Sequence, residues 1–123
     1  MSAETIARSF LTAFYRGDST SAREFLTDDF DFAGPFVALI GADQFLDSAA
    51  PLLDAARHTL VRHTWAQDGH VCVIHDVTLD GAPDPITMAD WFTVRDGRLA
   101  RERVVFDTAP LRAVLAHHPP AGR

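Results

Sequence analysis

The chain has 123 residues, of which 47% are hydrophobic and 23% charged, a composition typical of one globular domain. With 17 acidic and 11 basic residues the formal charge is −6, which argues against nucleic-acid binding because phosphate recognition needs clustered basic side chains. The single cysteine, Cys72, excludes an internal disulfide, and no apolar stretch has the length of a membrane span or the form of a secretory signal. We therefore expect a soluble, cytoplasmic protein that makes no membrane contact.

The N-terminal part of the sequence has a helical pattern. Residues 3–16 place apolar side chains on one side at helical spacing, and Gly17 ends this run. Asp18 or Ser19 can cap a short second helix that ends near Leu26. The first helix is amphipathic, so we expect its apolar side to cover a core.

A turn, a short strand and a third helix are predicted next. Residues 27–29 have the composition of a turn, and residues 30–32 alternate as a strand that stops at the Gly-Pro pair at 34–35. Residues 41–56 have the apolar spacing of a third helix, which Pro51 must kink or restart.

From residue 58 the hydrophobic period changes from helical to strand-like. Asp-Gly turn signals divide this half into strands at 58–67, 70–79, 86–95 and 98–107. A closing turn or short helix is predicted at 109–115 and a flexible tail at 117–123. Helices followed by an antiparallel meander predict a single α+β domain over residues 1–116.

Four segments carry a family resemblance through their order and spacing. They are FLTAFYRGD at 10–18, FLTDDFDFAGP at 25–35, IGADQF at 40–45 and ADWFTVRDGRLARERVVFDTAPL at 89–111. Together they resemble the nuclear-transport-factor-2-like (NTF2-like) superfamily, and within it the SnoaL-like branch of polyketide cyclases, ketosteroid isomerases and limonene-epoxide hydrolases. The resemblance implies a cone-shaped α+β barrel, in which N-terminal helices pack on a curved antiparallel sheet around a conical pocket. The fold hosts enzymes, binding proteins and assembly modules, so it does not define the activity.

Asp90 is the carboxyl that the resemblance supports best. It matches the acidic residue with which ketosteroid isomerases donate a hydrogen bond to the developing oxyanion. Met88 and Phe92, at two-residue spacing, are apolar, so an inward Asp90 would be desolvated, which favours the neutral acid. The alternative is a structural aspartate that is tied to a neighbouring strand or to water.

His75 and Asp107 are further candidates. Aligning the hairpin at 80–81 to the family turns His75 inward, on the strand beside Asp90. A neutral histidine is a common general base near pH 7, and a carboxylate neighbour would fix its tautomer, although a satisfied core histidine is the alternative. Asp107 could line the pocket mouth as a third acid–base group or cap the terminal turn.

The sequence also departs from its relatives. Gly34 stands where ketosteroid isomerases have their general base, Phe10 replaces their first-helix tyrosine, and Ala49 replaces a third-helix tyrosine found in some members. The Asp-Arg-Asp network of the epoxide hydrolases is not found in segments 74–77 and 103–106. Neither mechanism is therefore supported.

The residues favour an enzyme that isomerises, cyclises or hydrates a hydrophobic, oxygenated small molecule without a cofactor. His75 would move the proton, and Asp90 would polarise the substrate oxygen. The pocket is predicted to be lined by Phe10, Phe30, Phe32, Phe36, Val73, Met88, Phe92 and Phe106. A non-catalytic binder of an apolar ligand and an interaction domain are the alternatives. No metal site is expected, because the spacing of His58 and His63 on a strand places them on opposite faces.

The same alternation points Trp91 outward, beside Ile74 and Val105, in an apolar patch that is costly to expose in a small monomer. Family resemblance places a homodimer contact on this convex sheet face. We therefore expect a two-fold dimer that buries these residues, with polar contacts from Arg101 or Arg103.

Overall fold

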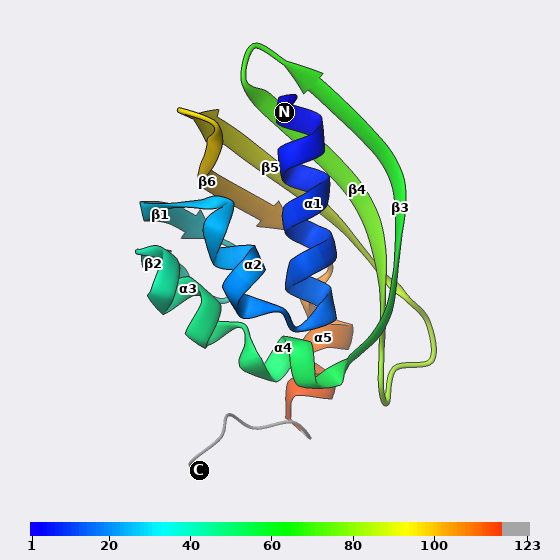
Figure 1. Cartoon of the computed structure of the whole chain (residues 1–123). Helices are drawn as coiled ribbons and strands as arrows, with labels where there is room; N and C mark the ends of the chain where they lie inside the picture. The colour runs from blue at the N-terminus through cyan, green and yellow to red at the C-terminus, as the bar shows by residue number, and fades with distance from the viewer. Residues whose placement is uncertain (117–123) are drawn as a thin grey trace.

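The computed structural model describes residues 1–116, so the tail predicted at 117–123 lies outside the described residues. The elements follow one another as α1 (Ala3–Arg16), α2 (Ser19–Glu24), β1 (Leu26–Ala33), β2 (Ala38–Ile40), α3 (Ala42–Ser48), α4 (Ala50–Ala55), β3 (Ala56–Gln67), β4 (His70–Leu79), β5 (Ile86–Arg95), β6 (Arg98–Val105) and α5 (Thr108–Leu115). The strands form one curved sheet, and α1 crosses its concave face (Figure 1). This confirms the predicted α+β architecture.

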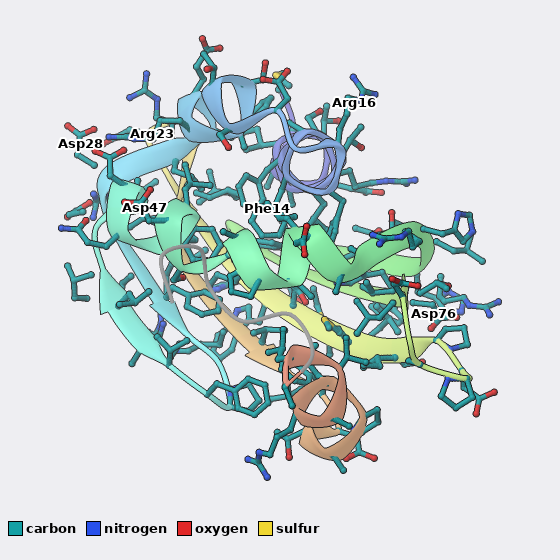
Figure 2. All side chains as sticks on the ribbon, turned by 90° about the horizontal axis from the view of Figure 1, so that it is seen from below. Phe14, Arg16, Arg23, Asp28, Asp47 and Asp76 are labelled. Carbon is teal, nitrogen blue, oxygen red and sulfur yellow. The ribbon has the colours of Figure 1, made fainter. Side chains whose placement is uncertain are left out.

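Helix α1 begins and ends at residues that cap it. The Ser2 hydroxyl accepts a hydrogen bond from the Thr5 N–H at 3.1 Å, and Gly17 takes the left-handed conformation (φ 80°) that ends the helix. Its side chains Phe10 and Phe14 are buried. Phe14 points into the interior (Figure 2), where its ring stacks on that of Phe45 at 5.7 Å.

The third predicted helix is broken in two, as Pro51 requires. Helix α3 ends at Ser48, and α4 restarts after Ala49 with Pro51 in its first turn, because proline has no N–H to continue the ladder. Arg23 of α2 holds this region by ion pairs with Asp28 at 2.8 Å and Asp43 at 2.9 Å; Arg23 and Asp28 lie together on the outside (Figure 2).

The sheet has the strand order β2-β1-β6-β5-β4-β3. The meander from β3 to β6 is antiparallel, as predicted, but β1 pairs with β6 in parallel. The short strand β2, which the sequence analysis did not predict, forms a hairpin with β1 around the Gly-Pro turn at 34–35. None of the helices within residues 1–116 has the length and apolar character needed to cross a membrane.

The turn predicted at residues 27–29 is wrong, because these residues belong to β1. Aspartate is unfavourable in strands, but here each carboxylate has an arginine partner. Asp28 pairs with Arg23 at 2.8 Å, and Asp29 pairs with Arg95, 66 residues away, at 2.6 Å. A partner so distant in sequence leaves no local signal.

The predicted facing of His58 and His63 is also wrong. His58 pairs with Thr78 and His63 with Ile74, and these partners lie on the same face of β4. The register shift at Arg62 is the cause, because an extra residue in a strand reverses the alternation that follows it. The histidines remain about 13 Å apart along the strand.

Candidate functional site

A cavity of about 230 Å³ lies between the helices and the concave face of the sheet. Its wall is almost entirely apolar and contains the predicted residues Phe10, Phe32, Phe36, Met88 and Phe106. At its mouth Phe36 is 40% exposed and packs edge-on against Phe106 at 5.7 Å. The Arg112 guanidinium lies over the Phe36 ring, 5.4 Å from its centroid.

Three residues predicted to line the pocket do not lie in its wall. Phe30, Val73 and Phe92 are fully buried in the hydrophobic core. Phe30 packs on Phe45 at 5.1 Å, and Phe92 packs on Phe10 at 5.9 Å. The prediction is wrong for these residues because strand alternation gives the face of the sheet but not the places where helix side chains cover that face.

Ionisable side chains from neighbouring strands form one row on the concave face. His75 comes from β4, Asp90 from β5 and Glu102 from β6, and they are 1%, 3% and 4% exposed. The register brings them together because His75 pairs with Met88, two residues before Asp90, and Glu102 pairs with Phe92, two residues after it. We call these residues the ionisable row.

His75 and Asp90 are joined, as their predicted neighbouring positions suggest. The His75 Nε2 lies 3.1 Å from the Asp90 Oδ1. When Asp90 is ionised, the Nε2–H must donate this bond, because a carboxylate offers only acceptors. Asp90 lines the cavity, whereas His75 lies behind it and is not part of the wall.

Glu102 is the functional candidate that sequence reasoning missed. It lines the cavity, and its Oε1 is buried with no hydrogen-bond partner among the described residues. Burial raises the pKa of Glu102 well above its ordinary value of 4.5, and the charge of Asp90 and a hydrogen bond with that side chain raise it further. Both effects favour the neutral acid at Glu102, the state that the sequence analysis expected of Asp90.

The sequence does carry a signal for Glu102, because the alternation that points Val105 outward and Phe106 inward also points Glu102 inward. Val94 pairs with Leu99 and Thr93 with Arg101, so Ala100 has no opposite partner. Counting back from the turn at 96–97 without this irregularity would place Glu102 opposite Trp91, on the convex face.

Asp107 lies apart from the ionisable row. Its carboxylate caps α5 by accepting a hydrogen bond from the Ala109 N–H at 3.1 Å, and the residue is exposed and outside the cavity wall. This is the capping arrangement weighed for it in the sequence. Within residues 1–116 no group of three metal-ligating side chains could hold an ion.

The convex face carries a second, open groove. Trp65 of β3, Cys72 of β4, Trp91 of β5 and Arg103 of β6 pair in one row across the sheet. Trp91 is 46% exposed, with the Arg101 guanidinium 5.7 Å from its ring centroid. Ile74 and Val105 lie on the same face, as the alternation predicts.

A family model matches most of the chain. Residues 7–102 match the SnoaL-like domain, so the chain belongs to the SnoaL-like family. A comparison with curated proteins gave no match.

Solved structures agree on the NTF2-like fold. An NTF2-like protein of unknown function from Cytophaga hutchinsonii is 19% identical, with 91% of this chain and 96% of that chain covered and a TM-score of 0.78. An LEH-like epoxide hydrolase from M. tuberculosis is 18% identical, with coverages of 94% and 90% and a TM-score of 0.74. A putative polyketide cyclase from Xanthomonas campestris is 23% identical, with coverages of 92% and 96% and a TM-score of 0.73.

Proposed function

We propose that this SnoaL-like protein is an enzyme that performs acid–base chemistry on a compact, hydrophobic, oxygenated molecule. Isomerisation, cyclisation and hydration are the reactions that fit. The observation that carries the proposal is the pair formed by Asp90 and Glu102, two carboxyl groups in the wall of an apolar cavity. Burying such groups is costly, and carboxyl pairs with unequal proton affinities are a recurrent means of holding an acid and a base together.

The two carboxyl groups have different roles. Asp90 is the base, and His75 acts on it as a positioning residue through the Nε2–Oδ1 contact of 3.1 Å. Glu102 keeps its proton because burial and the charge of Asp90 raise its pKa, so it can donate a hydrogen bond to a substrate oxygen. The role that the sequence suggested for His75, direct proton transfer with substrate, passes to Asp90 because His75 is outside the cavity wall.

The cavity restricts the size and polarity of the substrate. Its volume of about 230 Å³ is below the roughly 300–1,000 Å³ typical of sites for drug-sized ligands. The two carboxyl groups lie on the sheet side of the cavity, and the aromatic side chains Phe36 and Phe106 line its mouth. A compact terpenoid or polyketide-like ketone or epoxide, with its oxygen directed towards the carboxyl pair, fits these features.

Deuterium exchange tests the base directly. With a compact ketone in deuterium oxide, Asp90 would remove a proton from the carbon next to the carbonyl, and Glu102 would stabilise the enolate oxygen. The Asp90 carboxyl would exchange this proton for a deuteron from the solvent and return the deuteron to the carbon. NMR would follow the exchange. We expect Asp90→Asn to slow it about 10²–10⁴-fold, because general-base catalysis contributes that much.

Asp76→Asn is the matched control for this experiment. Asp76 is an aspartate of β4 on the convex face, paired with Arg62 at 2.8 Å, and its replacement should leave the exchange rate unchanged. A ketone that binds but exchanges only at the rate in buffer would contradict the enzyme and support the non-catalytic binder.

The proposed assembly is a two-fold dimer through the convex face, supported by the exposed row of Trp91 and its neighbours. Light scattering should give twice the chain mass of 13.5 kDa, and Trp91→Glu should shift the mass towards the monomer. Thr12→Glu places the same charge on the exposed side of α1 and should leave the dimer intact. A monomeric wild-type protein would contradict this assembly.

The proposed compartment is the reducing cytoplasm, in which Cys72 stays a free thiol.

A further inference from the structure

Helix α5 borders the mouth of the cavity and places an arginine there. Leu111 and Leu115, one turn apart on α5, line the cavity wall, and Arg112 follows the first of them. Its guanidinium lies over the ring of Phe36, 5.4 Å from the centroid. Phe36 is 40% exposed, whereas both carboxyl groups of the wall are buried. A positive charge therefore stands at the solvent end of the cavity, away from the carboxyl pair.

The Arg112 guanidinium has no carboxylate partner within residues 1–116. Most arginines in this part of the chain form an ion pair, as Arg23 does with Asp28. Arg112 instead stacks on an aromatic ring, which limits the conformations of the side chain and leaves the edge of the guanidinium available as a hydrogen-bond donor. A guanidinium held in this way suits a planar carboxylate.

The charges of the protein restrict where a negative group of a ligand can lie. The carboxyl pair is negative inside the cavity when Asp90 is ionised, and the whole chain carries a formal charge of −6. Both repel an anionic group from the interior. At the mouth the same group stays hydrated and meets the positive charge of Arg112.

Resting on the proposed function, we propose that Arg112 selects substrates that carry a carboxylate at the end opposite the reacting oxygen. The ketone or epoxide oxygen points towards the carboxyl pair, the apolar skeleton fills the cavity, and the carboxylate accepts hydrogen bonds from Arg112 at the mouth. This narrows the substrate class to compact keto acids and epoxy acids. Arg112 contributes to affinity and orientation, and no bond is made or broken there.

Keto acids of graded length test this selection. The shortest is a cyclohexanone with a carboxylate at the ring position opposite the ketone, and longer probes insert methylene groups before the carboxylate. Each has a neutral amide of nearly the same shape. In NMR titrations at low ionic strength, at least one carboxylate should bind about 2- to 5-fold more tightly than its amide, the range of an exposed ion pair. Added salt should reduce this preference.

Arg112→Gln should abolish or reverse the preference, because only the repulsive negative charge of the protein then remains. The residue is exposed and outside the cavity wall, so the amides should bind as they do to the wild-type protein. Arg98→Gln is the matched control. It removes an exposed, unpaired arginine at the start of β6, whereas α5 follows the other end of that strand, and it should keep the preference.

The outcomes separate this inference from the proposed function. Carboxylates and amides that bind equally at every length, or a carboxylate preference that survives in Arg112→Gln, would overturn the role of Arg112 and leave the carboxyl pair intact. Deuterium exchange of the bound amides depends on the carboxyl pair and not on Arg112. Amides that bind without exchanging would overturn the proposed function, and this inference with it.

Discussion

On β4, β5 and β6, the ionisable row points towards the helices from an otherwise apolar face, whereas the opposite face of the same strands carries the exposed ring of Trp91. Asp90 is 3% exposed, and Trp91, the next residue, is 46% exposed. At these positions the usual distribution is reversed, because the buried side chains are ionisable and the exposed side chain is a large apolar ring. Both departures cost free energy, so each supports what we propose for its face, chemistry in the cavity and dimerisation on the convex face.

The largest effect on stability is expected on β5, where Phe92 and Trp91 are adjacent in sequence but lie on opposite faces of the sheet. Phe92 is fully buried in the core, so Phe92→Ala should lower the free energy of unfolding by about 3–5 kcal/mol. Trp91→Ala, one residue away, should change the stability of the isolated chain far less, because that ring already meets solvent. Urea unfolding of both variants, at protein concentrations low enough to keep the chain monomeric, would measure this difference in stability. Equal losses would show that the strand facing is wrong.

An intermediate effect should report the proton on Glu102. Between pH 4.5 and its raised pKa, Glu102 stays protonated in the folded protein but loses its proton on unfolding, so stability falls as pH rises. Glu102→Gln has no such proton. Relative to wild type it should therefore gain about 1.4 kcal/mol per pH unit across that window, from unfolding curves at a series of pH values. A difference that is independent of pH would contradict a neutral Glu102.

The sequence predicts most of the fold but only part of this site. The α1 helix, the break at Pro51 and the meander follow from periodicity and turn residues. Asp90 and His75 follow from alternation and resemblance. Glu102 could have followed as well, because the alternation that points Phe106 inward also points Glu102 inward, whereas a count from the turn at 96–97 fails at the irregularity at Ala100. Strand alternation predicts that Phe92 points towards the helices. Whether it borders the cavity or packs in the core depends on the helix side chains above it, and the structure places it in the core.

The smallest effect should separate Asp107 from the ionisable row. Asp107→Ala removes the side-chain cap of α5 and should cost about 0.5–2 kcal/mol of stability. Ketone exchange at a temperature where the variant is folded should be unchanged, since the carboxylate is outside the cavity wall. A loss of exchange comparable to that in Asp90→Asn would return Asp107 to the chemistry.

Infrared difference spectroscopy in deuterium oxide tests most directly whether the concave face holds one neutral and one ionised carboxyl group. At neutral pH the wild-type spectrum should contain the C=O band of a protonated carboxylic acid, and Glu102→Gln should remove it, whereas Asp76→Asn should not. A wild-type spectrum with only ionised carboxylate bands at neutral pH, or a protonated band that survives in Glu102→Gln, would contradict the account.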